Sequence, residues 1–253
     1  MPRPAAAHES PQRLVGGLDA EHAAALALQR SLLPARLPDI PGVELAARYV
    51  PGHAFGIGGD WYDVFTLPSG WLGVVIGDVS GHGLASAVVM GRVRSALRAY
   101  ALICDDPAEA LTLLNRKVHH FEAGSLTTAL YAMISPGRDR IVLSSAGHLR
   151  PVLVRPGAAA ELADIPVDPP LGIGNRMPPR RTGTVAFPPG AVLLCYTDGL
   201  IERRDEVIDI GLARLIGLVK ADNAERVCAT VMAAGDTEQP GDDVAVLAVR
   251  RPA

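Results

Sequence analysis

The feature of this sequence that most constrains its fold is the way strand-like segments follow one another. Short apolar runs rich in β-branched residues are joined by tight turns such as Pro136-Gly137-Arg138-Asp139, and helical segments come in blocks. Parallel strands need long crossover connections, whereas antiparallel strands need only a short turn. The pattern therefore predicts an α+β fold of mainly antiparallel sheets with segregated helices, and it disfavours a doubly wound parallel sheet.

Individual elements can be placed along most of the chain by hydrophobic periodicity and by turn signals. Strands are expected over residues 43–50, 61–67, 72–76, 128–134, 140–145, 151–155, 184–187, 191–196 and 244–249. Helices are expected over residues 84–101, 107–121, 210–219 and 223–234. The stretch 156–183 is rich in Pro and Gly and is expected to be a long connection.

The N-terminal part of the chain divides into two segments. Residues 1–17 are rich in Pro, Ala and polar residues and are expected to be a disordered tail. A linker helix is expected over residues 18–33, at the start of a domain that extends over 18–251. Apolar residues recur on it every seven positions, at Leu18, Ala25 and Leu32. This stripe could pack on its own domain, or it could contact a second copy of the chain or a regulator.

Composition narrows the class of protein. The 253 residues are 49% hydrophobic, which suffices for a sizeable core. A net charge of −3 and an aromatic content of 4% provide neither the basic field nor the stacking platform that nucleic acids need. The three cysteines are widely spaced in apolar contexts, which indicates buried reduced thiols. No apolar run reaches the ~18 residues of a membrane span, and the first residues lack a signal-peptide pattern, so a cytoplasmic protein is expected.

Aspartates recur where predicted strands begin or end. Asp60 and Asp242 each precede a strand, whereas Asp78 and Asp198 each follow one. In an antiparallel sheet the end of one strand lies beside the start of its neighbour, so these four carboxylates can gather at one edge. Each alone could belong to an ordinary turn. A buried salt-bridge network is an alternative, but the nearby Arg and Lys residues are too few to neutralise the set.

A carboxylate cluster of this kind indicates a particular chemistry. Four carboxylates at one edge cannot all ionise without a compensating cation. Oxygen ligands suit Mg²⁺ or Mn²⁺, whereas zinc would require His or Cys at ligand spacing. Two such ions can clamp a phosphoryl group and generate a nucleophile for in-line attack. The pattern therefore indicates a metal site of a kind that can support a reaction at phosphorus.

Five motifs carry these and neighbouring residues in a fixed order. They are Gly-Gly-Asp60-Trp-Tyr-Asp63, Gly-Asp78-Val-Ser-Gly-His-Gly, Ser145-Ala-Gly-His148, Tyr-Thr-Asp198-Gly-Leu-Ile-Glu202 and Gly-Asp242-Asp243-Val-Ala-Val. Together they resemble the bacterial SpoIIE/RsbU-type branch of the PP2C (PPM) serine/threonine phosphatases, over about residues 18–250. The resemblance implies a PP2C-like α-β-β-α sandwich of two mainly antiparallel sheets flanked by helices, in agreement with the strand pattern.

The resemblance also implies a site with two Mn²⁺ or Mg²⁺ ions. Asp78 would bridge both ions, and the backbone carbonyl of Val79 would assist. Three further aspartates would complete the metal shells, partly through water: Asp60, Asp198 and Asp242. Asp63 and Asp243 would be auxiliary ligands. A hydroxide that bridges the metals would attack phosphorus directly, so catalysis would rest on the four main aspartates.

The sequence departs from the eukaryotic-type members of the family at two places. Where those enzymes carry a proposed general-acid histidine, this chain has Ser80, with His82 two residues later. The stretch 51–57 also lacks the arginine that binds phosphate in those enzymes. The general acid and the phosphate-binding group are therefore not assigned. His148 is interpreted as structural, because it follows a predicted strand at a tight turn.

The implied function is a Mn/Mg-dependent protein phosphatase in a bacterial regulatory circuit. Members of the resembled branch act on phosphorylated Ser or Thr of small STAS-type anti-sigma-factor antagonists, in stress or sporulation circuits. A catalytically silent scaffold or binding module is one alternative, and the four main aspartates argue against it. A hydrolase of small phosphorylated molecules is another, because its chemistry would be the same.

Overall fold

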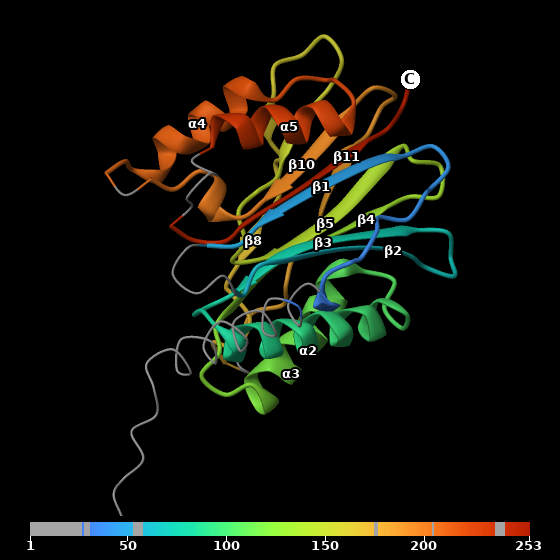
Figure 1. Cartoon of the computed structure of the whole chain (residues 1–253). Coiled ribbons are helices and arrows are strands. Elements are labelled where there is room, and N and C mark those ends of the chain that lie inside the picture. Colours follow the sequence, from blue (N-terminus) through green and yellow to red (C-terminus); the bar gives the residue numbers. More distant parts are fainter. Residues whose placement is uncertain (1–26, 28–30, 53–57, 175–176, 204, 236–240) are drawn as a thin grey trace, which may run out of the picture.

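Two β-sheets pack face to face between two pairs of helices (Figure 1). This computed structural model describes residues 27, 31–52, 58–174, 177–203, 205–235 and 241–253. The predicted tail 1–17 and nearly all of the predicted linker helix lie outside these residues. The layered arrangement confirms the predicted α+β sandwich of mainly antiparallel sheets.

Each sheet has its own set of strands. The five-stranded sheet has the order β1 (Glu44–Val50), β11 (Val244–Arg250), β10 (Val192–Tyr196), β6 (Val152–Val154) and β7 (Glu161–Leu162). The six-stranded sheet contains, in order, β2 (Trp61–Thr66), β3 (Leu72–Val79), β4 (Thr127–Ile134), β5 (Arg140–Ala146) and β8 (Val167–Asp168), and β9 (Gly183–Ala186) also pairs with β5. The β5–β8 pair is parallel, and the other pairs of named strands are antiparallel.

Helices cover the outer faces of both sheets (Figure 1). The six-stranded sheet is covered by α2 (Leu84–Ala101) and α3 (Pro107–Phe121), and the five-stranded sheet by α4 (Ile208–Leu218) and α5 (Ala224–Ala234). The start of α3 follows the sequence signal, because Pro107 occupies the first turn and the Asp106 side chain accepts a hydrogen bond from the Ala108 amide. A short 3₁₀ helix, η1 (Asp198–Leu200), follows β10.

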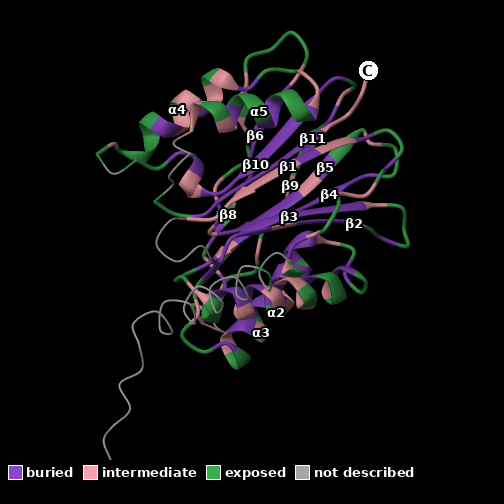
Figure 2. Cartoon of the chain, in the orientation of Figure 1, coloured by how far each residue is buried: buried purple, intermediate pink, exposed green. Residues whose placement is uncertain are grey.

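The alternation of strand side chains divides the core into layers. Along β3, Leu72, Val74 and Ile76 lie in the core between the two sheets. Val75 and Val79, which point the other way, pack toward α2 and α3. Most strand residues are accordingly buried, and the exposed residues concentrate on the outer sides of the helices and in the loops (Figure 2).

The observed elements depart from the predicted ones in two informative places. β3 extends to Val79, so Asp78 lies inside this strand instead of after it. The predicted long connection 156–183 is wrong as a description, because it contains β7 and β8. Each of these strands has only two residues, too few to produce a periodic signal in the sequence.

The three cysteines agree with the prediction of buried reduced thiols. Cys104, Cys195 and Cys228 are buried free thiols. Among the described residues, no helix is both long and apolar enough to span a bilayer.

Candidate metal site

The first pair of aspartates is brought together by the register of β2 and β3. Trp61 pairs with Gly77, so the preceding residue, Asp60, lies opposite Asp78. Asp78 is two residues beyond Ile76, which lies in the inter-sheet core, and strand side chains alternate between faces. Both carboxylates therefore belong to the face that looks toward the other sheet.

The second pair comes from the five-stranded sheet. Asp198 opens η1 directly after β10, and Asp242 stands just before β11. The two segments lie side by side, because the Thr197 amide donates a hydrogen bond to the carbonyl of Ala245 over 3.0 Å. The charges of Asp198 and Asp242 both act on Asp78, so the structure brings acidic residues of both sheets to one end of the sandwich.

Asp243 lies at the same end but has partners of its own. Its side chain is buried, and its Oδ2 accepts a hydrogen bond from the Tyr49 hydroxyl over 2.8 Å. Its Oδ1 accepts another from the Gly52 amide over 2.7 Å. Asp243 therefore ties the start of β11 to the end of β1, beside the main carboxylates.

Burial and mutual repulsion disfavour the ionised forms of these groups. Burial is the main factor that raises the pKa of Asp78 to about 7, and the charges of Asp198 and Asp242 add to it. Burial followed by the charge of Asp78 raises the pKa of Asp60 well above its usual range. The pKa of Asp198 is also raised, first by burial and then by Glu202. The site thus concentrates negative charge where little solvent can stabilise it.

These residues fit a divalent cation, although they do not form a closed ligand set. Asp60 is only 3% exposed, and its Oδ2 is buried without a hydrogen-bond partner. Within the described residues, no three His, Cys, Asp or Glu side chains are already drawn together as metal ligands. The carboxylates are instead coupled through their charges. A cation would supply the missing partner of Asp60 and relieve the repulsion.

Two glycines allow the backbone to close around this end of the sandwich. A Cβ atom on Gly59 would lie 1.9 Å from the carbonyl oxygen of Val79, and one on Gly199 would lie 2.1 Å from the carbonyl oxygen of Asp243. Any larger residue would displace those carbonyl groups. The Gly-Gly-Asp and Asp-Gly parts of the motifs are therefore required by close packing of the strand ends.

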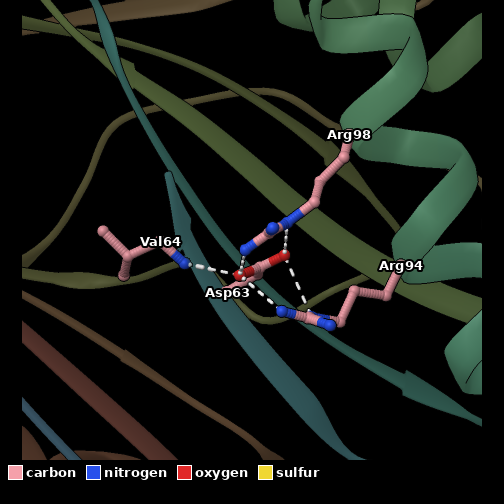
Figure 3. A network of polar contacts seen from close by, with 4 residues as sticks. All are labelled: Asp63, Val64, Arg94 and Arg98. Atoms are coloured by element: carbon pink, nitrogen blue, oxygen red, sulfur yellow. Dashed lines mark hydrogen bonds and ion pairs between the residues drawn. The ribbon is translucent and has the colours of Figure 1, made fainter. Parts of the chain in front are cut away.

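Asp63 lies on the opposite face of β2 from Asp60 and serves a different purpose. Figure 3 shows its carboxylate held by two arginines of α2. Arg98 donates from Nε to Oδ2 over 2.6 Å and from Nη2 to Oδ1 over 2.7 Å. Arg94 Nη2 and the Val64 amide also donate to Oδ1. Because both oxygens are occupied, we withdraw the expected auxiliary metal role of Asp63 and interpret it as the anchor of α2.

Two residues beside the site were not found by sequence reasoning. Thr197 contributes a side-chain hydrogen bond that lowers the pKa of Asp60, and its Oγ1 also accepts a hydrogen bond from the Ala245 amide over 2.8 Å. Its position directly before Asp198 in the motif was an available signal. Tyr49, which binds Asp243, had no signal, because only the pairing of β1 with β11 brings them together.

The pKa of Asp78 predicts how the stability of the metal-free protein depends on pH. Its usual value is 3.8, and its folded value is about 7. A raised pKa in a folded acid means that stability present at low pH is lost as pH rises through the folded value. We therefore expect Asp78→Asn to gain stability relative to the native chain between about pH 4 and pH 7.

This expectation can be measured by urea unfolding in EDTA at pH 5, 6, 7 and 8. The difference between the two proteins reports the titration of Asp78 together with its effect on Asp60, and the slope of opposite sign that His148 contributes is common to both proteins. Burial lowers the pKa of His148 to about 4. A difference between the two proteins that stays constant with pH would contradict the prediction.

Comparison with known proteins agrees with this geometry. Residues 68–252 match the family model described as Stage II sporulation protein E (SpoIIE). The chain belongs to the SpoIIE family. This assignment, together with the fold, confirms the resemblance to SpoIIE/RsbU-type PP2C-like phosphatases that the five motifs indicated.

Two individual relatives show how far this chain is similar to other proteins in sequence and structure. The phosphoserine phosphatase RsbP of Bacillus subtilis (strain 168) is 26% identical over 151 residues, which are 58% of this chain and 37% of RsbP. The crystal structure of the RsbU and RsbW domains of Rv1364c from Mycobacterium tuberculosis is 29% identical, with a TM-score of 0.77, over 88% of this chain and 64% of that chain.

A third likeness concerns the fold alone. The crystal structure of RsbX in complex with magnesium is 15% identical, with a TM-score of 0.66, over 85% of this chain and 98% of that chain. The SpoIIE-family chain described here spans only 35% and 37% of the lengths of two curated relatives that it matches.

Proposed function

We propose that this chain is a divalent-metal-dependent protein serine/threonine phosphatase. The observation that carries the proposal is the meeting of Asp78 on β3 and Asp60, which directly precedes β2, with acidic residues of the opposite sheet. This arrangement occurs in a chain of the SpoIIE family, and the relative RsbP is named a phosphoserine phosphatase.

The proposed metal ligands are the residues that share this end of the sandwich. Asp78 is the central ligand, with the Val79 carbonyl beside it. The other proposed ligands are Asp60, Asp198 and Asp242. Asp243 holds hydrogen bonds from Tyr49 and Gly52, so we propose it as an auxiliary residue that orients the start of β11.

Two ions, Mn²⁺ or Mg²⁺, are proposed by analogy with the PP2C fold, and the fold neighbour RsbX was solved with magnesium. When bound, such ions bind phosphoryl oxygens and make a water molecule acidic enough to act as a nucleophile. The role of the protein itself is to hold the carboxylates in position before the ions bind. Asp78 is fixed by the pairing of β3 with β4, Asp60 directly precedes the paired strand β2, and Asp198 is fixed by the η1 turn.

The proposed substrate is phosphoserine or phosphothreonine on a small regulatory protein of the STAS type. The support is the relationship to RsbP and to a protein whose structure contains RsbU and RsbW domains. We place this reaction in the cytoplasm of a bacterium, in a circuit that controls a sigma factor. A scaffold without activity and a phosphatase of small molecules are the competing functions.

The test uses the full chain, stripped of metal with EDTA and then titrated with Mn²⁺ or Mg²⁺. We expect hydrolysis of p-nitrophenyl phosphate that depends on the metal, and faster release of phosphate from a serine-phosphorylated STAS protein. A phosphotyrosine peptide serves as the control substrate. No hydrolysis at any metal concentration would support the scaffold, and hydrolysis of the ester without any action on phosphoproteins would support the small-molecule phosphatase.

A further inference from the structure

The crossing between the two sheets carries a buried histidine that the proposed chemistry does not use. The chain leaves the six-stranded sheet at the end of β5 and enters the five-stranded sheet at β6. His148 lies in this crossing and is 4% exposed. A buried polar ring needs hydrogen-bond partners, and those of His148 come from both sheets.

The two ring nitrogens of His148 contact one strand in each sheet. Nδ1 lies 2.8 Å from Oγ1 of Thr128 on β4, and Nε2 lies 3.2 Å from the carbonyl oxygen of Tyr196 on β10. A carbonyl oxygen only accepts, so Nε2 carries the proton. In the neutral ring Nδ1 then accepts from the Thr128 hydroxyl. Burial keeps the ring neutral by lowering its pKa to about 4.

Each partner of His148 stands next to a proposed metal ligand. Thr128 pairs with Asp78 in the β3–β4 register. Tyr196 is the last residue of β10, two positions before Asp198. A single ring therefore connects the strand pair that holds Asp78 to β10, the strand that leads into Asp198.

The backbone around His148 is itself held in place. The Ser145 hydroxyl donates to the carbonyl oxygen of His148 over 2.8 Å, and the Gly147 amide donates to the carbonyl oxygen of Asp168 over 2.6 Å. The Tyr196 hydroxyl donates to the carbonyl oxygen of Arg150 over 3.2 Å. Hydrogen bonds thus hold the backbone of the β5–β6 segment on both sides of His148. The His148 ring is therefore held in a defined position between the two sheets.

We infer that His148 is a positioning residue that sets the spacing between the Asp78 and Asp198 sides of the metal site. The inference rests on the proposed function, because it concerns the ligands proposed there. It assigns to His148 a purpose beyond stabilising a turn. Removing its bond to Thr128 should let the two sheets settle at a different spacing and weaken metal binding.

Thr128 offers a matched pair of variants for the test. Thr128→Val keeps the shape of the side chain and loses the hydroxyl, whereas Thr128→Ser keeps the hydroxyl. Mn²⁺ binding to the EDTA-treated full chain would be measured by isothermal titration calorimetry. We expect Thr128→Val to raise the Kd by about 10-fold, as is usual for residues that orient ligands, and Thr128→Ser to stay close to the native Kd.

Unfolding in urea and ¹⁵N NMR of the histidine rings complete the experiment. We expect metal-free protein to show His148 protonated at Nε2 and bare at Nδ1. A ring protonated at Nδ1 would overturn the inference, and so would a Thr128→Val protein that is less stable but binds Mn²⁺ with the native Kd. Either result would leave the proposed function standing, whereas native protein that binds no Mn²⁺ would overturn both.

Discussion

Asp78→Asn should abolish metal-dependent phosphatase activity while the protein remains folded. The amide keeps the size of the side chain but removes the charge at the centre of the proposed ligand set. We expect kcat/KM to fall on the order of 10³-fold, which corresponds to about 4 kcal/mol of transition-state stabilisation. Hydrolysis of p-nitrophenyl phosphate at saturating Mn²⁺, together with circular dichroism to verify folding, measures the effect.

Asp164→Asn is the matched control for this substitution. Asp164 is an exposed aspartate in the segment between β7 and β8, outside the group of carboxylates at the proposed site. Its replacement should leave both activity and metal affinity unchanged. If Asp78→Asn retained a tenth or more of the native kcat/KM, Asp78 would not be the central ligand.

Asp63→Asn should produce the largest loss of stability among isosteric changes of the aspartates. The Asp63 side chain is 1% exposed and forms ion pairs with Arg94 and Arg98. The side chains of these arginines are 18% and 44% exposed, respectively. Breaking a buried ion pair by removing one partner costs about 3–5 kcal/mol, because the remaining charge loses its partner. We expect about 3 kcal/mol, because Arg98 can turn toward water.

Urea unfolding of metal-free protein at pH 7 measures this loss, and Glu161→Gln provides the control. Glu161 pairs with Arg155 across an exposed edge, where the side chains are 59% and 34% exposed. Exposed pairs contribute about 0–1 kcal/mol, so this variant should unfold almost as the native chain does. Equal midpoints for the two variants would show that the Asp63 network does not anchor α2.

Sequence reasoning identified the fold class, but it gave Asp63 and Asp60 similar roles, although their side chains lie on opposite faces of β2. The two are three residues apart, and an odd spacing on a strand places side chains on opposite faces. Once β2 is recognised as a strand, this alternation alone places Asp60 and Asp63 on different faces of the sheet. The position of Asp78 inside β3 was harder to foresee, because the predicted strand covered only residues 72–76 and the pairing with β4 continues through Val79.

Other contacts depend on residues that are distant in sequence and leave no local pattern. Tyr49 reaches Asp243 because β1 and β11 are neighbours, although they lie at opposite ends of the described chain. His148 was interpreted as structural from its turn, and its contact with both sheets could not be read from its own motif. The roles of the proposed ligands came from the family resemblance. The structure adds that their charges act on one another at one end of the sandwich.

The proposed metal ligands come from both sheets, and this has a consequence for the stability of the folded chain. A cation bound there would attract acidic groups from two separately hydrogen-bonded sheets, so it would bind the assembled sandwich and not the separated layers. A ligand that binds only the folded state adds about 2.7 kcal/mol of stability at a concentration 100-fold above its Kd. The free concentration of divalent cation would then change the free energy of unfolding of the chain as well as its rate of catalysis.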